Sequence, residues 1–408
     1  MTKKKALSLA LALCLLLSLA LILVGCGSPA EPERFISNCP PLTPGASSDT
    51  LDFAIRLYRA AYDGNNTLLS PLSVLAALAM TANGAAGKTK AQMENVLGAT
   101  IEELNAFFAG YLANLPQDET CKLSLADAIW IRENYAPKVR QSYLDALSDV
   151  YRAEVFNAPF NGETVGRINA WTNEKTDGMI PEIIRELEQD ETLLLLNALA
   201  FDAEWRSPYS ENQVCPGTFS KSDGTETDAV FLSDYENEFL SDGDRAIGFV
   251  KPYADVRYAF IALLPNEGIS LEYYLATLSG ERIASILADR RTDVVFETRI
   301  PKFEVRCQTD ALKDALQELG MIDAFQPEAD FSGISDDGFA ISRILHKTYL
   351  SVGEKGTRAG AATAVILAGG APEYLPVPVI LDRPFVYLIF DVENDLPLFI
   401  GTLNDPNG

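Results

Sequence analysis

Residues 193–201, LLLLNALAF, restrict the possible folds of this chain more than any other segment. Apolar side chains fill the run with almost no polar alternation, a pattern typical of a central strand that is covered on both faces. A strand of this kind needs packed layers on either side of its sheet. The segment therefore predicts a large, layered domain.

Helical patterns dominate the beginning of the domain. Residues 51–62 place their apolar side chains on one helical face. Ser70 then caps a helix whose first residue is a proline and whose side chains are apolar nearly all round, so we expect this helix to be buried. A later helix is expected to run to Gly320 from a cap at Thr309 or Asp310.

Strands dominate the later part of the chain. The further candidates are 258–264, 294–296, 385–392 and 397–403. The last two flank a short polar turn and predict an antiparallel hairpin. Neither an internal linker nor a repeat divides residues 51–408. We therefore expect a single domain of the α+β class.

The first 25 residues read as an export signal. Three lysines, Lys3–Lys5, precede an uncharged run from Ala6 to Gly25. The run leads into Cys26 and there resembles the lipobox of bacterial lipoproteins, in which this cysteine is lipidated. An uncleaved membrane helix is the alternative, because a run of this length spans a bilayer. Residues 26–50 are rich in Pro, Ser and Gly and read as a tether. We expect an exported protein anchored by lipid to a bacterial cell membrane, facing outward.

Charge and residue counts exclude several classes of function. With 33 basic and 57 acidic residues the net charge is −24, which repels nucleic acid. His346 is the one histidine, so no site can contain two imidazoles. The cysteines outside the signal and the lipobox match no zinc spacing, and their disulfide pairing stays open; they are Cys39, Cys121, Cys215 and Cys307. We expect no metal and no cofactor.

The enzymatic motifs in the sequence are weak. Residues 82–89 fit a relaxed phosphate-loop pattern, but they follow a buried helix where such a loop follows a strand. His346 has no partner serine in a G-x-S-x-G elbow, because the chain contains none. We therefore expect a protein that is not an enzyme.

A run of small residues lies between Val352 and Pro378. Read with the strand period of two, one face carries Thr357, Ala359, Ala361, Thr363 and Val365. This face can enter a crowded sheet without burying a charge, whereas Arg358, on the other face, would point to solvent. On pattern alone, an ordinary flexible surface loop is the alternative.

Separated motifs along residues 50–408 resemble the serpins, a family of serine protease inhibitors with a mobile reactive loop. They are SPLSVLAALAMTANGAAGKTKAQM at 70–93, INAWTNEKTDGMI at 168–180, LLLLNALAFDAEW at 193–205, IPKFEV at 300–305, LKDALQELGMIDAF at 312–325, HKTYLSVGEKGTRAGAATA at 346–364, RPFVYLIFD at 383–391 and LPLFIGTLNDP at 396–406. The resemblance implies one domain with helices packed on large, mostly antiparallel sheets, and an exposed reactive loop at about 354–378.

The resemblance also implies an irreversible mechanism. A serine or cysteine protease cleaves the loop, and the amino-terminal part of the cut loop inserts into the large sheet before the acyl-enzyme is hydrolysed. We expect a monomer whose partner is the target protease. The alternatives are a non-inhibitory serpin and a ligand-binding surface lipoprotein. A ligand-binding surface lipoprotein would show two α/β lobes, which the sequence does not predict.

Site residues follow from the same motifs. The shutter, a polar cluster beneath the sheet where its strands part, would comprise Ser70, Ser73, Asn197 and His346. The breach, where insertion begins, would comprise Trp205, Lys302 and Glu354, the last two as an ion pair. The hinge would comprise Glu354, Gly356, Thr357, Ala359, Ala361 and Thr363. Arg358 departs from the family, which more often has an acid there.

The resemblance implies a reactive bond sixteen residues beyond the hinge glutamate and eleven before the proline of the RPF motif, and the two counts disagree in this chain. Sixteen residues beyond Glu354 lies Gly370, which gives the bond Gly370–Ala371. Eleven residues before the proline of the RPF motif lies Glu373, which gives Glu373–Tyr374. We prefer the first bond, because the distance from the hinge sets how much strand can insert, while extra residues after the cut are absorbed as slack.

The loop composition bears on the class of target. No Lys or Arg lies between Ala359 and Asp382, so a trypsin-like protease, which needs a basic side chain, is excluded. Gly370 would suit an elastase-like protease, Tyr374 a chymotrypsin-like one and Glu373 a glutamate-specific one. We expect an elastase-like or chymotrypsin-like target.

Overall fold

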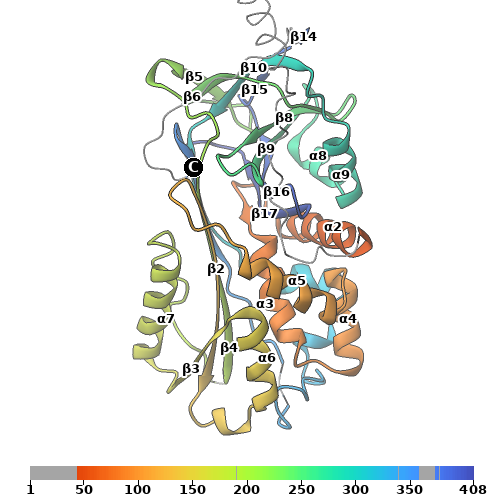
Figure 1. Cartoon of the computed structure of the whole chain (residues 1–408), viewed down its shortest axis with the longest axis vertical. Coiled ribbons are helices and arrows are strands. Elements are labelled where there is room, and N and C mark those ends of the chain that lie inside the picture. Colours follow the sequence, from red (N-terminus) through yellow and green to blue (C-terminus); the bar gives the residue numbers. More distant parts are fainter. Residues whose placement is uncertain (1–43, 190, 339, 358–372, 376) are drawn as a thin grey trace, which may run out of the picture. The chain divides into compact units, whose positions relative to one another are not determined.

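Strand β4 (Leu193–Glu204) lies inside a six-stranded sheet, as its apolar sequence predicts. The computed structural model describes residues 44–408 apart from 190, 339, 358–372 and 376 (Figure 1). We call this sheet the central sheet, and its strands in order are β11 (Phe303–Gln308), β12 (Lys347–Val352), β13 (Gly356–Thr357), β4, β2 (Cys121–Arg132) and β3 (Glu154–Ala158). Its strands pair antiparallel except β2 and β3, which are parallel.

Two further sheets complete the strand content of the described residues. One consists of β1 (Leu68–Leu69), β17 (Leu396–Leu403), β16 (Phe385–Asp391), β9 (Tyr258–Pro265), β8 (Ala246–Pro252) and β7 (Phe239–Ser241). The other consists of β5 (Val214–Ser220), β6 (Glu226–Glu236) and β10 (Val294–Pro301), with β14 (Glu373–Tyr374) and β15 (Val379–Ile380) parallel to β10. The hairpin of β16 and β17 is confirmed. β10 is longer than expected because polar side chains alternate with buried ones as far as Ile300.

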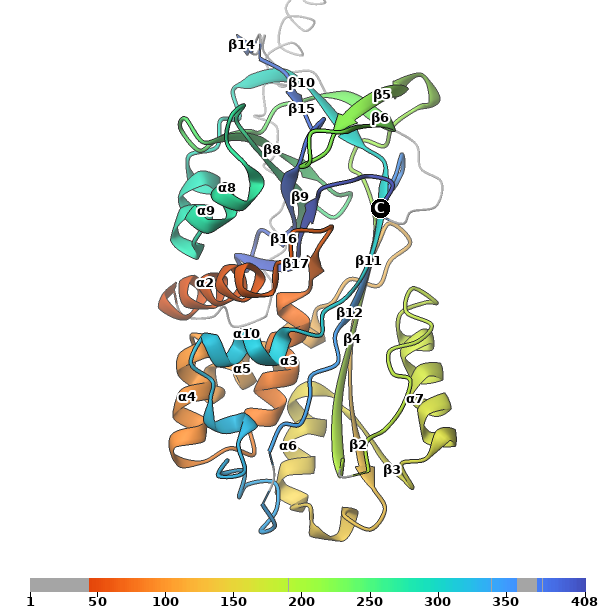
Figure 2. The same ribbon diagram turned by 180° about the vertical axis from the view of Figure 1, so that it is seen from behind.

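Helices cover both faces of β4, which confirms the prediction of a central strand. Leu194, Leu196 and Ala200 pack in a small core with Trp171 of α7 (Gly162–Lys175). Side chains on the opposite face of β4, such as Phe201, belong to the main core. Figures 1 and 2 show α7 on one side of β2 and β4, and α6 (Gln141–Tyr151) on the other. The fold is α+β with mostly antiparallel sheets, as predicted.

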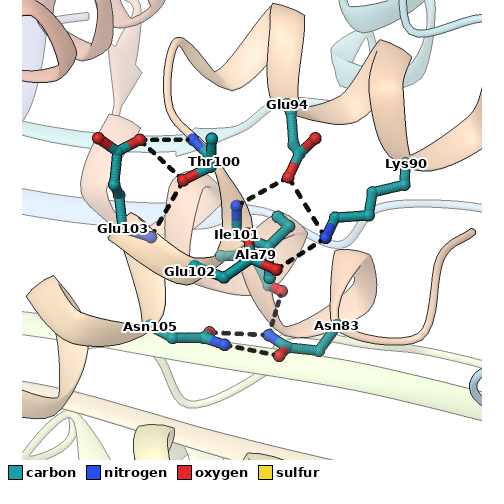
Figure 3. Close-up of polar contacts among 9 residues, drawn as sticks. All are labelled: Ala79, Asn83, Lys90, Glu94, Thr100, Ile101, Glu102, Glu103 and Asn105. Carbon is teal, nitrogen blue, oxygen red and sulfur yellow. Dashed lines mark hydrogen bonds and ion pairs between the residues drawn. The ribbon is translucent and has the colours of Figure 1, made fainter.

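The predicted start of the buried helix α3 (Pro71–Ala82) is confirmed. Its N-cap is Ser70, whose Oγ accepts a hydrogen bond from the backbone of Ser73, and every residue except Ala77 is buried. The other end is held by a reciprocal pair of amide hydrogen bonds, at 2.9 and 2.8 Å, between Asn83 and Asn105 of α5 (Ile101–Ala113) (Figure 3). The helix that supports the central sheet is therefore fixed at both ends.

The loop between α4 (Gly87–Leu97) and α5 is fixed in the same way (Figure 3). Thr100 and Glu103 form a capping box at the start of α5. Glu94 accepts a hydrogen bond from the backbone of Ile101 at 3.0 Å, and Lys90 lies 2.9 Å from Glu102. The remaining α-helices of the described residues are α2 (Pro44–Ala61), α8 (Leu271–Thr277), α9 (Gly280–Ala288) and α10 (Leu312–Glu318).

Two expected helix boundaries need correction. The predicted cap at Thr309 or Asp310 is wrong, because α10 begins at Leu312 without a side-chain cap. The backbone N–H of Thr309 instead donates to the carbonyl of His346 at 3.1 Å, which keeps this residue in the extended path leaving β11. α2 begins at Pro44, so residues 44–50 are helical where a tether was expected.

The expected export signal, the lipidation site at Cys26 and the tether up to residue 43 lie outside the described residues. Within the described ranges, no helix combines the length and apolarity needed to cross a membrane. The cysteines described there, Cys121, Cys215 and Cys307, carry free thiols.

Candidate functional site

Among the described strands, the central sheet has a gap between β12 and β4. The two-residue strand β13 joins them at one end, where Thr357 pairs with Val352 of β12 and with Ala203 of β4. From Asp202 to Leu193, β4 has no strand partner on this side in the part of the chain that the structure describes. The described hinge residues Gly356 and Thr357 thus lie at the first positions of a gap between the described strands.

A glycine is required at the mouth of this gap. A Cβ on Gly356 would lie 2.0 Å from the carbonyl oxygen of Ala203, which is far inside the contact distance. Only glycine therefore lets the chain pass this close to β4 and pair with it. Thr357 follows with 1 % of its surface exposed.

The structure brings the three expected breach residues together around the hinge. Lys302 donates to Glu354 at 2.7 Å, and this hydrogen bond lowers the pKa of Glu354. The indole N–H of Trp205 donates to the carbonyl of Gly353 at 2.9 Å, and its backbone N–H donates to Lys355 at 2.7 Å. These contacts fix the segment that leads into β13.

Beneath the breach lies a buried charged and aromatic cluster that the sequence reasoning missed. Lys251, 2 % exposed, pairs with Glu236 at 2.5 Å. Its ammonium group lies 4.5 Å from the ring centroid of Tyr209 and 5.6 Å from that of Trp205. Trp205 also stacks on Tyr253 at 4.6 Å. No spacing pattern distinguishes Lys251 from a solvent-facing lysine, so this cluster could not be predicted from the sequence.

Tyr253 connects the cluster to the hinge. Its hydroxyl lies 2.5 Å from Oγ1 of Thr357, and both residues are buried. Burial raises the pKa of Tyr253 well above its usual value, so the hydroxyl keeps its proton. The first hinge side chain in the sheet is therefore recognised by a hydrogen bond as well as by its small size.

The four expected shutter residues also meet, beneath the middle of β4. The backbone N–H of Ser70 donates to Nε2 of His346 at 3.1 Å. The hydroxyl of Ser73 donates to the side-chain oxygen of Asn197. The Asn197 amide then donates to Asp127 of β2 at 2.8 Å. Asp127 was not predicted, although the alternation of LSLADAIWI places an acid on the core-facing side of its strand.

Burial favours the neutral form of both titratable groups of the shutter. Burial lowers the pKa of His346 to about 4, so Nε2 is a hydrogen-bond acceptor at neutral pH. Burial raises the pKa of Asp127 to about 7, with the Asn197 hydrogen bond acting in the opposite direction. Oδ2 of Asp127 has no hydrogen-bond partner among the described residues. An ionised Asp127 is thus poorly solvated in this cluster.

We expect Asp127→Asn to raise the apparent melting temperature more at pH 8 than at pH 5. The raised native pKa means that the native protein binds this proton more tightly than the unfolded chain, so stability falls as pH rises from about 4 to about 7. The isosteric amide removes this penalty, a gain on the order of 5 °C at pH 8.

The matched control is Asp336→Asn, at a carboxylate with 89 % of its side chain exposed, and we expect no pH-dependent gain there. Melting scans of the three proteins at both pH values make the measurement. An equal gain from Asp127→Asn at pH 5 and pH 8 would show that burial does not penalise the charged carboxylate.

A cavity of about 520 Å³ lies at the far end of the gap. It is lined by Leu193, Leu194 and Leu195 of β4, by Leu78 of α3 and by residues 340–344 ahead of β12. The hydroxyl of Tyr135, a buried lining residue, has no partner among the described residues. Space for more side chains therefore exists where the gap ends.

The expected reactive bond Gly370–Ala371 lies outside the described residues, as do the hinge residues Ala359, Ala361 and Thr363. The alternative bond Glu373–Tyr374 is described and forms β14, which pairs with Val294 and Val295 of β10. The next backbone N–H, of Leu375, donates to Val295 at 2.8 Å. The backbone at the alternative bond is thus already engaged in a sheet.

Comparisons with known proteins agree on one family. A family model described as Serpin (serine protease inhibitor) matches residues 48–406. An uncharacterized serpin-like protein of Thermococcus kodakarensis is 33 % identical over 366 residues, which cover 87 % of this chain and 84 % of that protein. Thyroxine-binding globulin of Rattus norvegicus is 30 % identical over 87 % of each chain. The crystal structure of the thermophilic serpin tengpin in its native state matches with a TM-score of 0.80 and 40 % identity, over 88 % of this chain and 94 % of tengpin.

Proposed function

The chain belongs to the serpin family, and from this premise we propose that it is an irreversible inhibitor of serine or cysteine proteases that acts by inserting its cleaved loop into the central sheet. The observation that carries the proposal is the gap between β12 and β4, with Gly356 and Thr357 already paired at its mouth. Such a gap is the receptor that strand insertion needs.

The register of β13 supports insertion of the residues that follow it. Continued from Thr357 and Ala203, the pairing brings Ala359 opposite Phe201 and Ala361 opposite Leu199. Residues directly opposite each other in a sheet share a face, so these small side chains would enter the main core.

The other face of the inserted strand is confined in a different way. The same register brings Ala362 opposite Ala198, which is buried beneath α7. A small side chain is therefore favoured at position 362, opposite Ala198. In an inserted strand that keeps this register, Arg358 would fall opposite Asp202, a half-buried carboxylate of β4. The solvent-facing position of Arg358 stays a prediction.

The far cavity favours a strand that ends near Leu367. In the same register, Val365, Ile366 and Leu367 fall opposite Leu195, Leu194 and Leu193, which line the cavity. Insertion would fill this space with the large apolar side chains of the loop. A cut at Gly370–Ala371 frees the chain just beyond that point, and the alternative Glu373–Tyr374 is held by β10. We therefore propose Gly370–Ala371 as the reactive bond, with an elastase-like protease as the target.

Export and anchoring are separate proposals. The basic start, the uncharged run and Cys26 support export and lipidation at the membrane surface. We propose that the inhibitor faces outward as a monomer. A lipid anchor would concentrate it at the cell surface, where it would meet external proteases.

A non-inhibitory serpin is the second candidate, because one relative is named for binding thyroxine. The described hinge residues argue against it, since Gly356 and Thr357 fit the gap without strain on their neighbours. A hinge unsuited to insertion would carry bulky or charged side chains at these positions.

The test is to mix the purified protein with elastase, chymotrypsin, trypsin and a glutamate-specific protease and to run denaturing gels. We expect a complex that survives denaturation with elastase or chymotrypsin, and a released carboxy-terminal fragment that begins at Ala371 by mass spectrometry. Proteases with an inactivated nucleophile are the control and should give no stable complex.

Each other outcome has a definite meaning. Cleavage of the loop without any stable complex favours the non-inhibitory serpin. A fragment that begins at Tyr374 or Leu375 moves the reactive bond. Inhibition of trypsin through a cut within 359–382 contradicts the specificity argument, because that stretch has no basic residue between Ala359 and Asp382.

A further inference from the structure

Two exposed tyrosine rings touch each other beside the point where the loop rejoins the fold. Tyr235 of β6 and Tyr374 of β14 have ring centroids 6.3 Å apart, and each is 58 % exposed. Val377, three residues beyond Tyr374, is exposed as well, at 53 %. Exposed apolar residues that occur singly are ordinary, but a pair of rings in mutual contact forms a patch.

The sheet register shows that these rings share one face. β10 lies between β6 and β14, with Glu297 opposite Tyr235 and Val295 opposite Tyr374. Val295 and Glu297 are two positions apart and therefore point to the same side. The residues of β10 between and beside them, such as Val294 and Phe296, are buried. The two tyrosines thus lie on the outer face of this sheet.

We infer that this patch, Tyr235 with Tyr374, is a docking surface for the target protease, separate from the reactive bond. The inference rests on the proposed function. Tyrosine is among the residues that most often dominate the binding energy of protein interfaces, because it buries a large ring at a low cost in side-chain entropy. No described element covers the two rings.

The distance to the reactive bond fits this role. Tyr374 lies four residues beyond Gly370, which is at most about 14 Å of extended chain. A protease that covers about 800 Å² of its partner reaches roughly 16 Å from the centre of the contact. A protease seated on Gly370–Ala371 would therefore extend over Tyr374, and over Tyr235 next to it.

The chemistry of the patch points to a basic protease surface. The faces of tyrosine rings attract Lys and Arg side chains, and the chain as a whole carries a net charge of −24. Glu297, between the two rings in the register, adds a carboxylate, which also pairs with Arg299 at 2.8 Å. We expect the complementary region of the protease to carry Lys or Arg beside the part of its cleft that binds residues after the cut.

The experiment measures second-order association rate constants with each protease that forms the stable complex. We expect Tyr235→Ala to lower the rate constant about 5-fold to 20-fold, with the stoichiometry of inhibition unchanged, because Tyr235 lies outside the loop and takes no part in insertion. Tyr235→Phe should keep the rate. Tyr235→Lys should fall below Tyr235→Ala, because it adds repulsion toward a basic surface.

Tyr273→Ala is the matched control, since Tyr273 of α8 is 61 % exposed and lies outside the patch. Its rate constant should equal that of the wild type. The proposed docking surface is wrong if the rate constant of Tyr235→Ala stays within twofold of the wild type with every protease that forms the complex. Equal rate constants for Tyr235→Ala and Tyr235→Lys would contradict the expectation that the protease presents a basic surface to the patch. A wild-type protein that traps no protease contradicts the proposed function itself.

Discussion

Thr357→Arg is expected to convert the inhibitor into a substrate, so that the loop is cut while the stable complex disappears. Thr357 is 1 % exposed, and its hydroxyl lies 2.5 Å from that of Tyr253. An arginine there would have to enter the core beside Trp205 and Tyr253 as an unpaired charge, which costs several kcal/mol. Because Thr357 already lies in the sheet of the intact protein, the arginine would displace the hinge from the sheet. Insertion would then have to bury the charge, and the acyl-enzyme would be hydrolysed instead.

The measurement is the number of inhibitor molecules consumed per protease molecule inhibited. We expect this stoichiometry to rise at least about tenfold, because each 1.4 kcal/mol of added barrier to insertion favours hydrolysis by that factor. Arg358→Ala is the control, because continuing the strand beyond Thr357 would place position 358 on the opposite face from Thr357, and it should still inhibit. An unchanged stoichiometry for Thr357→Arg would show that this face does not enter the sheet.

The parts of the fold that follow from local pattern were predicted from the sequence. The run 193–201 required cover on both faces, and α7 and the main core supply it. Ser70 followed by proline identified the start of α3, because the cap and the first helical position depend only on adjacent residues. The wrong cap of α10 shows the limit of this reasoning. The backbone of Thr309 is bound by His346, which is distant in the sequence.

The candidate site was predictable only where motifs exist for it. Breach and shutter residues were found through the resemblance, and the structure brings each set together. Asp127 and Lys251 were missed for a common physical reason. A buried charge is tolerated only when its surroundings compensate for lost water, and those surroundings come from other elements. The alternation around Asp127 was the one local signal available.

Cleavage of the loop between Ala359 and Glu373 is expected to raise the apparent melting temperature on the order of 10–20 °C. Among the described residues, β4 has no strand partner on one side from Asp202 to Leu193, and a cavity of about 520 Å³ lies at the end of this stretch. A cut loop is free to pair with both flanking strands and to fill that cavity with Val365 and Leu367. On the proposed mechanism, the intact loop would be what keeps the native state from this more stable arrangement, so the native state would be a kinetic trap.

Thr357→Arg supplies the control for this result as well. The same protease should cut the loop of this variant, but the charge at position 357 should prevent insertion. The cut and uncut forms of the variant should therefore have the same melting temperature. Thermal scans of intact and cut protein, for the wild type and for the variant, therefore separate the effect of the nick from the effect of the new strand. If the cut and intact forms of the wild type have the same melting temperature, the native state is not a kinetic trap. If the cut variant gains as much as the wild type, the gain does not come from a strand that enters the sheet at Thr357, and the breach cluster around Tyr253 has no part in it.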